Sequence, residues 1–181
     1  MPNNQGRVLQ SVAMASNAPA DDADMFDLAP VSLWLEDFSA VREIFEGWHA
    51  QGIADLRAFL LENLARVAKC SSSIRLIKVN QRTLTLFGAK DVDHLVSNLG
   101  TVFRDEMVGH FHEQLIDLWE NRLFHQREVV NHSLEGQQLH VHLQFSVFPG
   151  HEADWDLALV ALTDITRAQE GGGVPGVSRQ A

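Results

Sequence analysis

The sequence has a single cysteine, Cys70, and this scarcity excludes an internal disulfide framework. An unpaired thiol is typical of a protein kept in a reducing compartment, so we expect a cytoplasmic location. Long apolar runs are also missing, since no stretch approaches the roughly 18 residues that a membrane-spanning helix requires. The first residues lack a basic start followed by an apolar core, so we expect no secretory signal peptide.

Basic residues are scarce as well. The chain has 14 Lys and Arg against 24 Asp and Glu, and its formal net charge is −10. A surface that binds nucleic acid must neutralise phosphates with clustered positive charge. The charge balance therefore argues against a nucleic-acid partner.

Catalytic signatures are absent too. The sequence has no glycine-rich phosphate loop, no Gly-x-Ser-x-Gly elbow and no set of kinase motifs. The pair His112-Glu113 begins like a zincin motif, but the position that needs a second histidine holds Ile116. We therefore predict a protein that is not an enzyme. The alternative is an enzyme on a cone-shaped α+β barrel, which would need a His/Asp dyad that the pattern does not place.

The sequence does have the content of one folded domain, with 181 residues of which 45% are apolar. The apolar run 157–166 predicts a central strand that ends at a polar Asp-Ile-Thr. Apolar periodicity also predicts strands at 32–38, 74–79, 127–134 and 138–148. Gly136 would supply the positive φ of the hairpin between the last two of these.

Helical periodicity occupies the intervening segments. Two amphipathic helices are predicted in 40–69, between the first two strands, with Ser39 as the N-cap of the first and 71–73 as a loop after the second. Further helices follow, capped by Asn80 and Asp91, and a long one spans 105–123. The fold class is thus α+β, with helices on one face of a five-stranded antiparallel sheet and an extra two-helix insertion after the first strand.

The two ends of the chain have a different composition. Residues 1–25 are rich in small polar residues, which predicts a segment that is disordered or that binds a partner. The glycine-rich residues 169–181 predict a flexible tail. The folded domain is therefore expected at 26–168.

Three stretches of this domain resemble a PAS domain, a sensory module of bacterial signalling proteins. They are the strand-to-helix step from Val79-Asn80 to Phe87-Gly88, the glycine turn at Gly136, and the closing Thr163-Asp164-Ile165-Thr166. The strand at 34–38 and the helices after it are similar to PAS domains that precede histidine kinases and diguanylate cyclases. The resemblance implies a homodimer that acts on an output domain or a partner kinase or cyclase.

The resemblance also implies where a signal would leave the domain. Asp164, Ile165 and Thr166 match the family's exit from the last strand, so we expect them to relay the change. Only a short charged stretch follows before the glycines. We therefore expect the output domain to lie in another chain or in a part outside this sequence.

An apolar cavity is expected between the sheet and the helices. Sites of this kind bind mostly apolar ligands through a few polar anchors. Haem, flavin or a small metabolite stay open as ligands, and a cavity filled by side chains without a cofactor is the favoured alternative. The expected lining residues are Phe87, Leu95, Phe103, Phe111, His112, Leu115, Val141, Leu143, Leu159 and Ala161.

Three histidines invite a metal or haem hypothesis. His112 lies beside the apolar face of the long helix, where some PAS domains ligate haem; a hydrogen-bonded histidine at the core edge is the favoured alternative. His140 and His142 share one face of a strand, which is half of a metal site. A two-residue turn would place Asn131 and Val129 opposite them and turn His132 to the other face. No third ligand results, so we predict no metal site and a polar stripe on the outer face.

Overall fold

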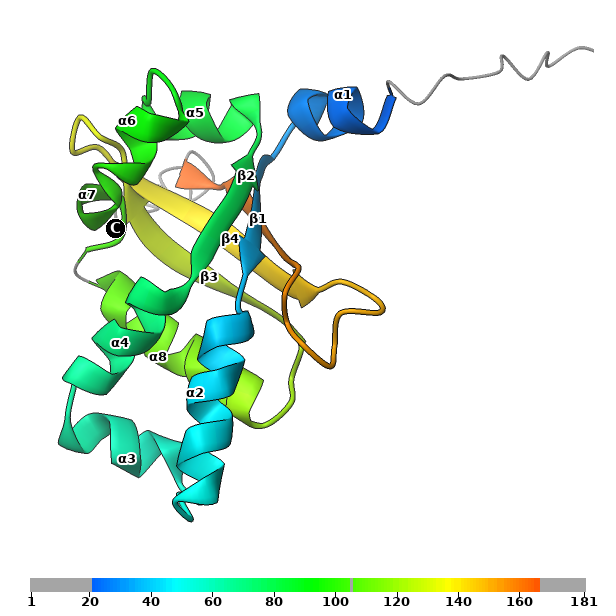
Figure 1. Cartoon of the computed structure of the whole chain (residues 1–181). Helices are drawn as coiled ribbons and strands as arrows, with labels where there is room; N and C mark the ends of the chain where they lie inside the picture. Colours follow the sequence, from blue (N-terminus) through cyan, green and yellow to red (C-terminus); the bar gives the residue numbers. More distant parts are fainter. Residues whose placement is uncertain (1–20, 105, 167–181) are drawn as a thin grey trace, which may run out of the picture.

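The computed structural model describes residues 21–104 and 106–166. A five-stranded antiparallel sheet forms its centre, with strand order β2-β1-β5-β4-β3. Figure 1 shows α5, α6 and α7 at one end of the sheet and α2, α3, α4 and α8 at the other. The predicted α+β class with a five-stranded antiparallel sheet is confirmed. The strands are β1 (Ser32–Asp37), β2 (Arg75–Val79), β3 (Phe124–His132), β4 (Gln138–Val147) and β5 (Ala158–Asp164).

The central position of β5 confirms the interpretation of the apolar run at 157–166. This strand pairs with β1 on one side and with β4 on the other. Buried residues alternate along β5, with Ala158, Val160 and Leu162 facing the helices. Leu159 and Ala161, which lie between them, are half-buried on the opposite, outer face.

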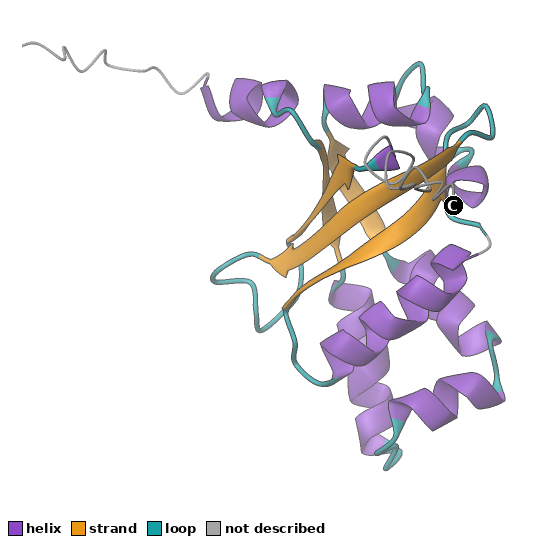
Figure 2. Cartoon of the chain, turned by 180° about the vertical axis from the view of Figure 1, so that it is seen from behind, coloured by secondary structure: helices purple, strands orange, loops and turns teal. Residues whose placement is uncertain are grey.

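The insertion between β1 and β2 contains three helices rather than the predicted two: α2 (Ser39–Ala50), α3 (Leu56–Glu62) and α4 (Ala65–Ser73). The extended backbone of Asn63 ends α3, so the apolar pattern runs through a break in the helix. Figure 2 shows the helices grouped below the strands, where α8 packs with the insertion. Residues 71–73, predicted as a loop, form the last turn of α4.

The start of α2 differs from the prediction as well. Ser39 is already helical and its side chain caps nothing. Instead, the carboxylate of Asp37 accepts a hydrogen bond from the Ser39 N–H at 2.8 Å. Asp37, which precedes the helix, thus provides the capping acceptor that was predicted to come from Ser39.

Local capping signals after β2 are where the sequence predicts them. Asn80 accepts from the Thr83 N–H at the start of α5 (Gln81–Phe87), and Gly88 ends this helix with a φ of +69°. Asp91 likewise caps α6 (Val92–Val96). Two helices follow, α7 (Leu99–Val102) and α8 (Glu106–Trp119), and α8 is shorter than the predicted 105–123.

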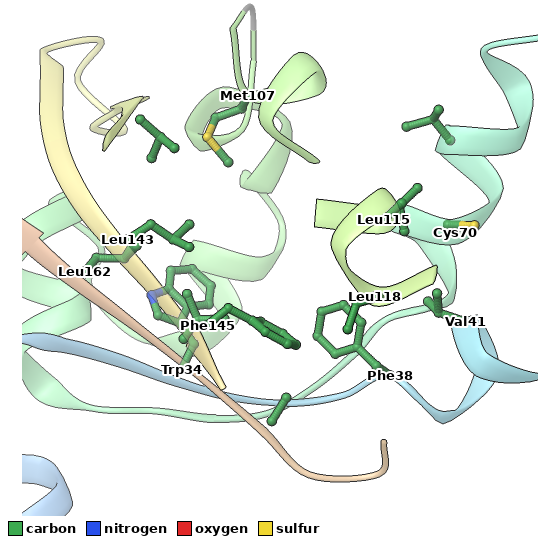
Figure 3. Close-up of a cluster of buried hydrophobic side chains, with 14 of the residues drawn as sticks. Trp34, Phe38, Val41, Cys70, Met107, Leu115, Leu118, Leu143, Phe145 and Leu162 are labelled. Atoms are coloured by element: carbon green, nitrogen blue, oxygen red, sulfur yellow. The ribbon is translucent and has the colours of Figure 1, made fainter. Parts of the chain in front are cut away.

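The core lies between the sheet and the helices. Figure 3 shows Trp34, Phe145 and Phe38 in a row across the sheet, with Leu115 and Leu118 of α8 beyond them. The rings of Phe38 and Phe145 meet edge to face with centroids 5.2 Å apart. Phe45 of α2 packs against Trp119 of α8 with centroids 5.2 Å apart, which joins the insertion to the main core.

The hairpin between β3 and β4 has a different register from the predicted one. Asn131 pairs with Leu139, Val130 with His140, and Glu128 with His142. The loop runs through residues 133–137, and Gly136 has the expected positive φ of +87°. Because the loop is longer than two residues, each residue of β3 lies opposite a different residue of β4 than the prediction gave.

The helix α1 (Asp21–Leu28) precedes the sheet and overlaps the predicted boundary at residue 25. The side chain of Asn80 donates to the Phe26 carbonyl at 3.1 Å, and Lys78 lies 3.3 Å from Asp27. These contacts hold α1 to the start of the domain. The predicted tail at 169–181 and residues 1–20 lie outside the described residues. Within the described part of the chain, no helix is long and apolar enough to cross a membrane.

Candidate functional site

A cavity of about 430 Å³ lies between the sheet and the helices α4, α7 and α8. Its volume is typical of sites that enclose a small molecule. The sheet and the chain adjoining it contribute Trp34, Glu36, Phe38, Ile74, Leu76, Asn131, Leu143, Val160 and Leu162 to the wall. The helical side consists of Leu64, Val67, Ala68, Ser71, Leu99, Gly100, Phe103, Met107, Val108, Phe111 and Gln114.

The pairing of the strands shows how the cavity crosses the sheet. Glu36 pairs with Ala158 of β5, which pairs with Val147 at one end of β4. Asn131 pairs with Leu139 near the other end of β4. Glu36 and Asn131 therefore border the cavity from diagonally opposite parts of the sheet. Figure 3 shows Trp34, Leu143 and Leu162, which line the stretch between them.

The exposed lining residues mark where the cavity meets the surface. Leu64 at the start of α4 is 63% exposed and Val108 on α8 is 52% exposed. Ala68 and Gly100 beside them are exposed too. The mouth of the cavity therefore lies between the insertion and the α7–α8 segment.

The structure brings only some of the predicted lining residues to this cavity. Phe103, Phe111 and Leu143 border it. Phe87, Leu95, Leu115 and Val141 are fully buried in the core but are absent from the cavity wall.

Two predicted lining residues belong to the outer face of the sheet. Leu159 and Ala161 alternate with Val160 and Leu162, and the latter two line the cavity. The sequence pattern could not assign the two faces of β5, because both are apolar and period-2 alternation distinguishes faces only when one of them is polar.

Glu36 is the lining residue with an ionisable side chain, and sequence reasoning missed it. The alternation of β1 could have found it, since Trp34, Glu36 and Phe38 are spaced two apart and the first and last are large and apolar. The Glu36 side chain keeps some accessible surface because it borders the cavity. Its apolar surroundings raise the pKa of the carboxyl to about 7.

Asn131, like Ser71 and Gln114, is a polar lining residue that sequence reasoning missed as a site. Its side chain has no accessible surface, and neither its amide nitrogen nor its amide oxygen has a hydrogen-bond partner. Asn80, equally buried, binds through both side-chain atoms, accepting from the Leu33 N–H and donating to the Val31 carbonyl. An unpaired buried amide destabilises a protein, so a hydrogen-bonding partner for Asn131 would be stabilising.

The predicted relay residues lie where β5 ends. The Ile165 N–H donates to the His140 carbonyl at 2.8 Å, and the Thr166 hydroxyl accepts from the His140 N–H at 3.1 Å. The Asp164 carboxylate accepts from the Thr166 N–H at 2.9 Å. These bonds fix the direction in which the chain leaves the sheet.

Comparison with known proteins identifies the architecture. No protein-family model matches the chain, and no curated protein does. Solved structures do: the PAS domain of a Colwellia psychrerythraea protein aligns with a TM-score of 0.52 at 16% identity, covering 81% of this chain and 96% of its own. A PAS domain of a LuxR-family transcriptional regulator from Burkholderia thailandensis, in complex with ethanol, gives 0.51 at 10%, covering 81% and 98%. The Rhodobacter sphaeroides LOV protein gives 0.53 at 14%, covering 81% and 66%.

The protein has the PAS fold. The predicted resemblance is confirmed at this level. In this PAS fold, the insertion supplies Leu64, Val67, Ala68 and Ser71 to the cavity. The part of the chain that departs from the usual PAS pattern therefore forms one wall of the candidate site.

The histidines of this domain lie outside the cavity wall. His112 is buried on α8, its Nδ1 is 3.6 Å from Glu113, and its Nε2 has no hydrogen-bond partner. It is absent from the residues that line the cavity. The structure thus does not aim the haem candidate into the candidate site.

His140 and His142 lie on the outer face of the sheet, as the sequence predicts. The observed register also places His132 on this face, in contrast to the prediction that it points to the other one. His140 borders a shallow second hollow, with Glu106, His110 and Glu128 nearby. In the described ranges, however, no three His, Cys, Asp or Glu side chains are arranged to hold a metal ion.

Cys70 is fully buried on α4. Burial raises the pKa of its thiol to about 11, so the reactive thiolate form is suppressed at neutral pH. The structure therefore gives this cysteine a packing role next to α8, as Figure 3 shows.

Proposed function

We propose that this protein is a non-catalytic PAS sensory domain that binds a small, mostly apolar molecule in the cavity beneath its sheet. The observation that carries the proposal is the cavity itself, which has a volume of about 430 Å³ and opens to the surface beside Leu64 and Val108. Asn131 lies in the cavity wall with both amide atoms unpaired and without accessible surface, so a rotation of this side chain would let a ligand with one donor and one acceptor satisfy them. Apart from Glu36, Ser71 and Gln114, the remaining side chains of the wall are apolar or glycine, which suits a ligand with an apolar body.

The similar structure from Burkholderia thailandensis supports the proposal, because that PAS domain was obtained in complex with ethanol. A small organic molecule can therefore bind to a domain of this fold.

We further infer that the end of β5 passes the signal on. Val160 and Leu162 line the cavity, and Asp164 and Thr166 follow on the same strand and its exit. A ligand that shifts β5 would shift the bonds to His140, and coupling of this kind typically amounts to 1–3 kcal/mol. The receiver would be an output domain or a partner, such as a histidine kinase or a diguanylate cyclase, in the cytoplasm.

The test is native mass spectrometry combined with an absorption spectrum of the freshly purified protein. We expect a mass increment that disappears on denaturation, and the spectrum would identify a haem or a flavin. Asn131→Leu should lose the increment, whereas Asn98→Leu, away from the cavity wall, should keep it. A protein that purifies without a ligand and whose melting temperature no metabolite shifts would contradict the proposal.

A second candidate function, homodimerisation without a ligand, is favoured by the outer face of the sheet. Leu33, Leu35, Val130, Leu159 and Ala161 are apolar and half-buried there, and Leu35 pairs with Leu159. An apolar sheet face of this kind is typical of a protein interface. Leu159→Glu should then convert a dimer to a monomer in light-scattering measurements, while Gln126→Glu on the exposed end of the same face should not. A monomeric wild-type protein would exclude this function.

A further inference from the structure

The carboxyl of Glu36 faces the cavity without a partner of its own. Trp34, Glu36 and Phe38 all line the cavity, so Glu36 borders it from the same side of the sheet as the two aromatic residues, although the register of β1 against β2 shifts between Leu35 and Glu36. Within the described residues, Glu36 makes no hydrogen bond or ion pair, and burial is the cause of its raised pKa. The pairing residues Leu76 and Ala158 on either side are apolar.

Within residues 21–104 and 106–166, no positively charged side chain forms an ion pair with this carboxyl. Among the residues that line the cavity, Glu36 is the only one that titrates, since the wall has no Asp, Lys, Arg or His. Arg75, on the strand next to β1, is bound to Asp37 at 2.8 Å. Arg75, the nearest basic residue along these strands, therefore already has an ion-pair partner. Among the residues that line the cavity, one is acidic and none is basic.

An ionised carboxylate in an apolar cavity is unfavourable unless an opposite charge or hydrogen-bond donors meet it. A ligand cation supplies both, because an ammonium group has positive charge and N–H donors. An anionic ligand would instead place a second negative charge beside Glu36. The charge of the wall thus selects among apolar molecules by the sign of their head group.

We propose that the ligand of this cavity carries a basic nitrogen on an apolar body, and that this nitrogen lies against the carboxylate of Glu36. The proposal rests on the proposed function, because it assumes that the cavity binds a small molecule. It adds the chemical class: an aliphatic or aromatic amine rather than a fatty acid or a neutral lipid. Asn131, at the other side of the sheet, would bind a polar group at the far end of a longer ligand.

Three probes with the same chain and different heads test the proposal on the full chain. They are decylamine, decan-1-ol and decanoic acid, with binding measured by isothermal titration calorimetry at pH 8. We expect decylamine to bind at least about tenfold more tightly than decan-1-ol, which corresponds to about 1.4 kcal/mol. Decanoic acid should bind most weakly of the three.

Glu36→Gln supplies the decisive variant, because glutamine keeps the size of the side chain and removes the charge. We expect this variant to bind decylamine and decan-1-ol equally well. Glu43→Gln, on an exposed position of α2, is the matched control and should retain the preference for the amine. A preference that survives Glu36→Gln overturns the proposal, since it would show that the amine binds elsewhere.

The pH dependence adds a readout that a merely structural role of Glu36 would not affect. Decylamine stays protonated between pH 5 and pH 8, whereas Glu36 has a pKa of about 7 and ionises within this range. Binding of the amine should therefore strengthen as pH rises towards 7 and level off above it. Glu36→Gln should flatten this profile, and an unchanged profile in the variant contradicts the proposal.

Decan-1-ol separates the two proposals. If the alcohol binds and Ala68→Phe at the cavity mouth weakens it, the cavity accepts apolar molecules and the proposed function stands. An amine that then binds no better than the alcohol overturns only the inference about charge. If none of the three probes binds to the wild-type protein, both the proposed function and the inference fail.

Discussion

The hydroxyl of Thr166 accepts a hydrogen bond from the backbone N–H of His140 at 3.1 Å, and this bond joins the exit of β5 to the neighbouring strand β4. Thr166 in turn donates its own N–H to the carboxylate of Asp164 at 2.9 Å. The position of His140 in β4 is therefore linked to the position of Thr166 at the exit of β5.

Asp164→Ala should alter the coupling between this domain and an attached output domain while leaving the fold intact. The substitution removes the acceptor that orients Thr166, and Asp164 is exposed, so we expect a loss of stability of only about 1 kcal/mol. The measurement is autophosphorylation of a fusion to a histidine kinase, with the melting temperature recorded in parallel. Thr166→Val should have the same effect through the bond to His140. Unchanged output in both fusions would exclude a relay through this exit.

Asn131→Leu should stabilise the ligand-free protein. The substitution replaces an unpaired buried amide by an apolar group of similar size, so the free energy of unfolding should rise by about 1–2 kcal/mol. Urea denaturation of the two proteins measures the difference. Asn80→Leu is the matched comparison and should destabilise the protein, because Asn80 is fully hydrogen-bonded. A destabilised Asn131→Leu would mean that this amide has a partner in solution.

Glu36 should make the ligand-free protein less stable as pH rises. The folded protein holds the Glu36 proton up to a pKa of about 7, above the value of 4.5 for a free glutamate, so the folded state binds more protons in between. Its stabilising effect is fully present below pH 4.5 and is lost as pH rises through 7. Glu36→Gln should therefore gain on the order of 2 kcal/mol over the wild type between pH 5 and pH 8. A constant difference across this range would show that Glu36 is well solvated.

His125 should have the opposite dependence, at acidic pH. It is buried and stacks on Phe145 with ring centroids 4.8 Å apart. Burial, assisted by the charge of Arg127, lowers the pKa of His125 to about 4 although Asp117 lies 3.7 Å away. Since the unfolded state takes up the proton first, stability falls as pH drops from 6.5 to 4. His125→Phe should reduce this loss in thermal unfolding series, and a parallel pH profile for the variant would contradict the assignment.

Much of the fold could be predicted because its signals are local. The caps at Asn80 and Asp91, the stop at Gly88 and the glycine at Gly136 each depend on a few neighbouring residues, and the structure has all four. The insertion was predicted with one helix too few, because the apolar spacing continues across Asn63 while its backbone is extended. Periodicity shows which residues face inward, but it does not reveal a break in a helix when the residues on both sides of the break still face the core.

The candidate site was harder to predict because it depends on long-range pairing. Leu159 and Val160 are equally apolar, so only the pairing of β5 with its neighbours decides which of them faces the cavity. Asn131 became a site residue through the length of the hairpin loop, which sets the register of β3 against β4. Glu36 was missed for another reason: an acidic residue in an alternating strand ordinarily points to solvent.

The insertion between β1 and β2 has a consequence for how this domain can diversify. It forms one wall of the cavity, and its lining residues Ala68 and Ser71 are exposed on α4 rather than built into the sheet. Substitutions there can reshape the entrance with little effect on the stability of the domain, because they remove no core contact. Under the proposed function, ligand preference would depend on the insertion and signal output on the end of β5, so one could be re-engineered while the other is kept.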